Sequence, residues 1–100
     1  MIPKKIHFAG RNYKVIEMDK LDGEESWGRT MMGSAEIFLE KGLSEDKKTE
    51  TLIHELIHIA YRHTSKSLSD EQEENIVRPW SMNIFGILKD NGFLKAEKSK

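Results

Sequence analysis

The chain has 100 residues and no cysteine; 37% of the residues are hydrophobic and 33% are charged, with sixteen Lys and Arg against seventeen Asp and Glu. This length supports one small domain, and the composition is that of a folded globular protein rather than a disordered chain. The balanced charge gives no reason to expect a nucleic acid or an anionic membrane as partner, and the lack of cysteine excludes disulfides, thiolate metal ligands and a cysteine nucleophile.

The first ten residues, MIPKKIHFAG, lack the apolar core of a secretory signal, and no later stretch is long and apolar enough to span a bilayer. We therefore expect a cytoplasmic protein with a single domain over residues 1–100. Residues 94–100 are rich in lysine and are expected to form a flexible tail.

A β-hairpin is predicted at the start of the chain. Ile6 and Phe8 alternate with polar residues, Tyr13 and Val15 do the same, and residues 10–12 (Gly-Arg-Asn) between them are typical of a turn. The segment that follows, residues 19–33, has several glycines and many charges without a clear period, so it is expected to be irregular.

A short edge strand is predicted at Ser34–Glu40, with Ile37 and Leu39 on one face and Phe38 on the other. The predicted fold class is therefore α+β. A small antiparallel or mixed sheet, made of the hairpin and this edge strand, should pack on the helices that follow.

Two helices complete the predicted domain. The first extends from Ser44, a candidate N-cap, to His63, and its apolar residues cover about half of its circumference, so it should be covered on more than one side. The second begins near Ser69 or Asp70 and continues to Asp90. Pro79 lies inside it, which predicts a kink or two abutting helices.

The sequence HELIH at residues 54–58 has the spacing of a zinc site. On a helix, His54 and His58 project from the same face one turn apart and can converge on one tetrahedral ion. Glu55 is rotated by about 100° from His54, which keeps it from coordinating but places its carboxylate beside an open position, where it could deprotonate a zinc-bound water.

The simpler interpretation is a helix that happens to contain two histidines in a core. It is less favoured because two histidines and a glutamate in such an apolar helix would be costly to bury without partners, and a metal would satisfy them.

A third ligand should come from the second helix. Glu73 lies within about 40° of Val77, Trp80, Ile84 and Ile87 on a helical projection, so it is the acid that should point inward. Glu74, about 100° away, is the alternative ligand, although an acidic first turn would also suit the helix dipole. His63 and His7 are not favoured as ligands: His63 suits the end of its helix, and His7 suits a strand surface.

HELIH followed by a helix-borne glutamate resembles the gluzincin pattern of zinc metallopeptidases in a minimal form. The layout is similar to minigluzincins and to small phage-type, ImmA/IrrE-like peptidase domains, and the matching segments are SAEIFLEKGLSEDKKTETLIHELIHIAY, EENIVRPW and ILKDNGF. The resemblance extends from about Ile6 to Phe93.

The resemblance implies a zinc peptidase with His54, His58 and Glu73 as ligands and Glu55 as base. It also implies that an extended peptide could bind along the strand at Ser34–Glu40. Longer gluzincins carry a further subdomain with a His or Tyr that stabilises the oxyanion, and this chain has no room for one. Tyr61 is the nearest candidate for that role, and Tyr13 is another.

The leading hypothesis is a zinc metallopeptidase, which could be latent. The alternative is a zinc-stabilised regulatory or protein-binding module without catalysis. A third hypothesis is a metal-free interaction domain in which Trp27, Trp80, Met31 and Met32 provide the contacts. Glu55 distinguishes the first two, because a structural site needs no acid beside an open coordination position.

Overall fold

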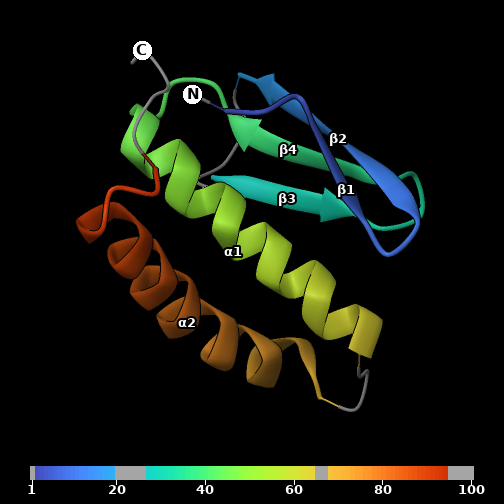
Figure 1. Ribbon diagram of the computed structural model, residues 1–100. Helices are drawn as coiled ribbons and strands as arrows, with labels where there is room; N and C mark the ends of the chain where they lie inside the picture. Colours follow the sequence, from blue (N-terminus) through green and yellow to red (C-terminus); the bar gives the residue numbers. More distant parts are fainter. Residues whose placement is uncertain (1, 20–26, 65–67, 95–100) are drawn as a thin grey trace.

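The computed structural model describes residues 2–19, 27–64 and 68–94 and confirms the predicted α+β class (Figure 1). Four strands are followed by two helices along the chain. The elements are β1 (Lys5–Phe8), β2 (Arg11–Met18), β3 (Gly28–Met31), β4 (Glu36–Glu40), α1 (Glu45–Thr64) and α2 (Asp70–Asp90).

The strands form one mixed sheet in the order β1-β2-β4-β3. β2 and β4 pair in parallel, whereas the two outer pairs, β1 with β2 and β3 with β4, are antiparallel. β4 is therefore an inner strand, and the prediction of an edge strand at Ser34–Glu40 is wrong. The edge strand beside β4 is β3, which belongs to the segment 19–33 that was expected to be irregular. Residues 20–26 of that segment lie outside the described residues.

β1 and β2 form the predicted hairpin through a two-residue turn. Phe8 pairs with Arg11, and the turn residues Ala9 and Gly10 have φ angles of 54° and 78°. Two consecutive positive φ angles are what a type I′ hairpin turn requires, and glycine at position 10 adopts its angle without steric cost. The turn thus starts earlier than predicted, and Arg11 and Asn12 belong to β2.

The core lies between one face of the sheet and α1. Ile37 and Leu39 of β4 are completely buried, and Phe38 between them points to the opposite face, as predicted. The buried apolar side chains of this core are Tyr13, Val15, Ala35, Ile37, Leu39, Leu52 and Ile59.

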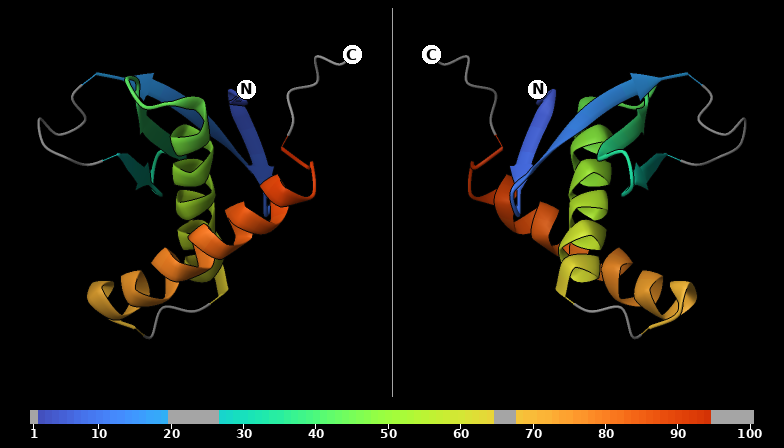
Figure 2. Two further views of the ribbon diagram at one scale, coloured as in Figure 1. Left: turned by 90° about the vertical axis from the view of Figure 1, so that its left-hand side faces the viewer. Right: turned by 90° about the vertical axis from the view of Figure 1, so that its right-hand side faces the viewer.

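α1 is the central element, with the sheet on one side and α2 on the other (Figures 1 and 2). It begins after Ser44, whose Oγ accepts a hydrogen bond from the Lys47 amide at 3.1 Å, so the predicted N-cap is confirmed. Because α1 is covered by two layers, its polar side chains between those layers must find partners inside the protein.

α2 runs antiparallel to α1. Three side-chain contacts follow in order along the two helices: Glu73 with Arg62, Ser81 with His54, and Lys89 with Asp46. Ser69 caps the start of α2 through reciprocal hydrogen bonds with Gln72, and Asn91 caps its end, close to the predicted bounds. The helix continues through Pro79 as one element, so two abutting helices are excluded.

The face of α2 that packs on α1 differs from the predicted one. Val77 and Ser81 are only 1% and 2% exposed, whereas Trp80 and Ile87, both expected to point inward, are 60% exposed. The buried face is thus centred about 40° further round the helix, on the side of Glu74. The expectation that Trp80 shares an inward-pointing face with Glu73 is therefore wrong.

Neither helix among the described residues combines the length and the apolar character needed to cross a membrane. The predicted tail, apart from Leu94, lies outside the described residues.

Candidate metal centre

α1 brings His54 and His58 together, with their ring centroids 4.9 Å apart. Glu74 of α2 reaches both rings. Its Oε2 lies 3.0 Å from Nε2 of His54, and its Oε1 lies 2.8 Å from Nε2 of His58. One carboxylate therefore joins the Nε2 atoms of the two histidines that the HELIH spacing predicts as ligands.

The charge of Glu74 depends on its neighbours. Partial burial raises the pKa of this carboxyl, but the two histidines and Arg78 outweigh burial and hold the pKa below its ordinary value. Arg78 Nη2 lies 3.1 Å from Oε2 of Glu74. These positive neighbours thus favour the ionised form of Glu74.

Glu73 is buried, as predicted, but it contacts the other side of His58. Its Oε2 lies 2.5 Å from Nδ1 of His58 and accepts a hydrogen bond from Nε of Arg62 at 2.9 Å. A carboxylate on the second ring nitrogen is the partner that orients a metal-binding histidine. In the structure, the alternative candidate Glu74 lies at the Nε2 atoms of both histidines, whereas the first candidate Glu73 lies at Nδ1 of His58.

His54 has a corresponding partner in Ser81, whose Oγ lies 3.2 Å from Nδ1 of His54. The same hydroxyl donates to the carbonyl of Arg78 at 2.9 Å, which fixes its orientation. Both histidines thus have Nδ1 occupied by a residue of α2 and Nε2 directed at Glu74.

Glu55 lies on the sheet side of this cluster. It is buried, and its Oε1 accepts a hydrogen bond from the Thr30 hydroxyl of β3 at 2.6 Å. β3 approaches closely because residue 28 is glycine: a Cβ there would lie 2.6 Å from Cγ2 of Thr51 and 3.1 Å from Oε2 of Glu55. The predicted base is therefore held by the edge strand.

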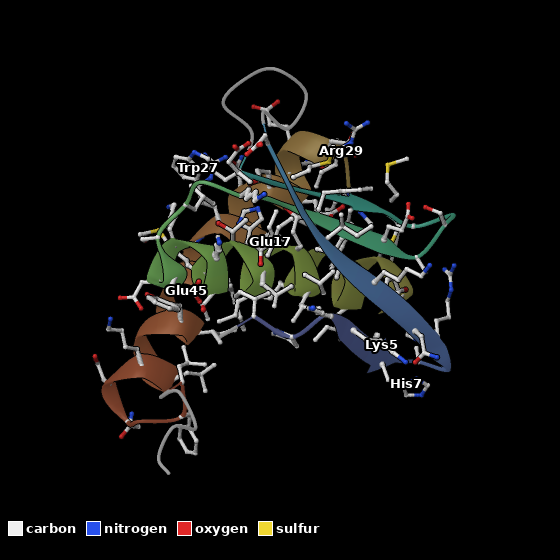
Figure 3. The ribbon with its side chains drawn as sticks, turned by 90° about the horizontal axis from the view of Figure 1, so that it is seen from above. Lys5, His7, Glu17, Trp27, Arg29 and Glu45 are labelled. Carbon is white, nitrogen blue, oxygen red and sulfur yellow. The ribbon has the colours of Figure 1, made fainter. Side chains whose placement is uncertain are left out.

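The cluster opens into a groove of about 830 Å³. Gly28, Arg29 and Thr30 form the β3 wall, Thr51, His54, Glu55 and His58 form the floor, and Glu74, Arg78, Ser81 and Met82 form the α2 wall. Trp27 and Lys47 also line it, and Lys47 Nζ lies 3.8 Å from the Trp27 ring centroid. Seen from above, Trp27 and Arg29 lie on the side of the sheet away from Lys5 and His7 of β1 (Figure 3).

The side chains of this cluster could hold a metal ion. His54, His58 and Glu74 each offer one donor atom, and these atoms lie within 4.8 Å of one another. Zinc bonds of about 2.0–2.2 Å in a tetrahedron place donors roughly 3.3–3.5 Å apart, whereas the donor atoms of this cluster are spread over as much as 4.8 Å, so the side chains would adjust around a bound ion. Two imidazoles and a carboxylate are also the ligand set of several catalytic zinc sites.

The remaining candidates lie elsewhere. Tyr61 is not among the residues that line the groove, and Tyr13 is buried in the core at 3% exposure. His7 is exposed on β1 and contacts Asn12, while His63 packs edge-on against Phe8. None of these four side chains reaches the cluster.

Arg78 and Ser81 were missed by the sequence analysis, although a signal for them exists. Glu74, Arg78 and Ser81 follow the spacing i, i+4, i+7, which places them on one helical face. The sequence has no similar pattern that points to Gly28 and Thr30, because their role depends on how β3 pairs with β4 and on how closely β3 approaches α1.

Comparisons with protein-family models, with curated proteins and with solved structures found no match to this chain.

Proposed function

We propose that this protein is a zinc-dependent metallopeptidase in which His54, His58 and Glu74 hold the metal and Glu55 is the general base. One observation carries the proposal: a single carboxylate, Glu74, lies within 3.0 Å of the Nε2 atoms of both histidines. Such a cluster with an acid beside it on the floor of an open groove is the arrangement that metal-assisted hydrolysis needs.

A zinc ion at these ligands would lower the pKa of a coordinated water toward neutrality and polarise the carbonyl of a bound peptide. Glu55 takes the proton of the attacking water and passes it to the leaving amine. The hydrogen bond from Thr30 keeps the Glu55 carboxylate beside the groove while the proton moves.

The proposed substrate is an extended peptide that binds along β3, in place of the strand first predicted. The Trp27 carbonyl accepts a hydrogen bond from the Glu40 amide at 2.8 Å. In an antiparallel ladder the hydrogen-bonded pairs alternate, so the backbone groups of Gly28 and Thr30 point away from β4. A peptide could pair with them by strand addition while its scissile bond lies over the floor of the groove.

A second candidate function is a zinc-stabilised binding module without catalysis. It is favoured by one observation: the ligands come from both helices, so a metal would fix α2 on α1. Such a module has no use for Glu55 beside the ligands, and a change at Glu55 therefore separates the two functions.

Hydrolysis of a fluorescently labelled unfolded protein, with zinc content measured in parallel, tests the proposal. Wild type loaded with zinc should release peptides, and Glu55→Gln should keep one zinc per chain and lose hydrolysis. If wild type binds zinc but releases no peptide, the non-catalytic module is the better account. Hydrolysis that survives in Glu55→Gln would contradict the assigned base.

A further inference from the structure

One cation occupies a distinctive place in the groove. Arg78 lies one turn after Glu74 on α2 and lines the wall opposite β3. Its Nη2 is 3.1 Å from Oε2 of Glu74, the same oxygen that lies 3.0 Å from Nε2 of His54. The Arg78 side chain is nevertheless 69% exposed, so most of its N–H donors face the groove or solvent.

Glu55, on the floor of the groove, and Arg78, on the α2 wall, approach the two histidines from different sides. Glu55 is tied to the β3 wall by Thr30, and Arg78 projects from the α2 wall. A peptide that lies along β3 above the histidines therefore has an acid on one side of its scissile carbonyl and a guanidinium on the other.

The proposed hydrolysis creates an oxyanion, and enzymes place donors where that charge develops. The tyrosines considered for this role do not line the groove. Among the other cations that do, Lys47 lies over the Trp27 ring and Arg62 binds Glu73. Arg29 belongs to the β3 wall, on the same side as the base. Arg78 is thus the groove cation that is both next to the candidate ligands and across from Glu55.

We propose that Arg78 is a catalytic residue that donates hydrogen bonds to the oxyanion of the tetrahedral intermediate; this inference rests on the proposed function. When the water oxygen bonds to the carbonyl carbon, its proton goes to Glu55 and the carbonyl electron pair moves to the oxygen that Arg78 faces. When the carbonyl re-forms, the C–N bond breaks and Glu55 returns the proton to the leaving nitrogen. The products are a carboxylic acid and an amine, so water is the only co-reactant.

Binding of two metal-directed probes tests this role without measuring turnover. The first is a peptide phosphonate, whose tetrahedral anion mimics the intermediate. The second is a mercaptoacetyl peptide of the same sequence, whose thiolate binds zinc and which has no tetrahedral oxyanion. Both are titrated calorimetrically into zinc-loaded wild type, Arg78→Ala, Arg78→Lys and Arg11→Ala, after zinc content has been measured. Arg11 is exposed on β2 outside the groove, so Arg11→Ala controls for the loss of one positive charge.

Arg78→Ala should keep its zinc and bind the phosphonate about 10- to 100-fold more weakly, since a hydrogen bond to a charged group contributes about 1.5–3 kcal/mol. Its affinity for the thiol should stay within about threefold of wild type, Arg78→Lys should fall between, and Arg11→Ala should match wild type for both probes. An unchanged phosphonate affinity, or an equal loss for both probes, overturns the assignment of Arg78. A wild type that holds no zinc, or holds zinc but binds neither probe, instead overturns the proposed metal site.

Discussion

The two walls of the groove position their functional groups by different physical means. The β3 wall holds Glu55 through one hydrogen bond and a close backbone approach that leaves no room for a Cβ at Gly28. On the α2 wall, charged contacts between long side chains hold the groups in place: Glu73 contacts Nδ1 of His58, and Glu74 contacts Nε2 of the same ring. Stability should therefore fall when a substitution adds volume on the β3 wall, and when a substitution removes a charge on the α2 wall.

Gly28→Ala should cause the largest loss of stability, about 1–3 kcal/mol, because its Cβ would meet Cγ2 of Thr51 at 2.6 Å. Urea denaturation measures the loss. Adding Thr51→Ser, which removes that methyl group, should restore part of it, and Gly33→Ala, with no atom within 4 Å, is the matched control. Equal stability of the Gly28 and Gly33 variants would show that β3 does not constrain α1.

Glu73→Ala should destabilise the metal-free protein by about 2 kcal/mol, because His58 and Arg62 both lose their bond to a buried carboxylate. Glu71→Ala removes an exposed acid from the same helical turn and should change the free energy of unfolding by less than about 0.5 kcal/mol. Denaturation of both variants in the presence of a chelator gives the comparison. A similar loss of stability in Glu73→Ala and Glu71→Ala would mean that the contacts of Glu73 with His58 and Arg62 do not hold the α2 wall in place.

Thr30→Val should reduce the free energy of unfolding by only about 1 kcal/mol, the value of one hydrogen bond. Its main effect should be on the proposed hydrolysis, because the Glu55 carboxylate loses the partner that orients it, whereas zinc content should stay at the wild-type level. Zinc loss in this variant would place Thr30 in the metal site instead. Unchanged hydrolysis would show that Thr30 does not position Glu55 for the reaction.

Glu17→Gln should have the smallest effect, on a contact outside the groove. Glu17 of β2 accepts a hydrogen bond from Lys48 of α1 at 2.7 Å, and this partner raises the pKa of Lys48 above its ordinary value of 10.5. Because the folded-state pKa is the higher one, the stabilisation is fully present below about pH 10.5 and is lost as the pH rises through the raised pKa. The difference between wild type and Glu17→Gln in thermal unfolding should therefore shrink above that pH, and a difference that grows there would contradict the sign.

The parts of the fold that depend on local spacing could be predicted from the sequence. His54 and His58 share a face because helical geometry fixes residues four apart, and the caps at Ser44 and Ser69 follow from side-chain chemistry next to the helix start. The alternation of Ile37, Phe38 and Leu39 likewise gave a strand with the correct buried face.

The α2 wall and β3 could not be predicted in the same way. The apolar Trp80 and Ile87 suggested a buried face centred on Glu73, but these residues are exposed and the polar residues Glu74 and Ser81 face α1. Hydrophobic periodicity misleads where a helix buries a polar site, because the residues that must face inward are then not apolar. β3 is short, and its place at the sheet edge is decided by long-range pairing with β4.

Zinc affinity of Glu74→Gln beside Glu73→Gln tests the central claim most directly, with wild type as reference. Calorimetric titration and metal analysis should give one zinc per wild-type chain. Glu73→Gln should bind zinc about 10- to 100-fold more weakly, the usual cost of changing a partner of a ligating histidine, and Glu74→Gln should lose more than that. The reverse order would contradict the assignment of Glu74 as the third ligand, and a wild type that binds no zinc would contradict the metal centre itself.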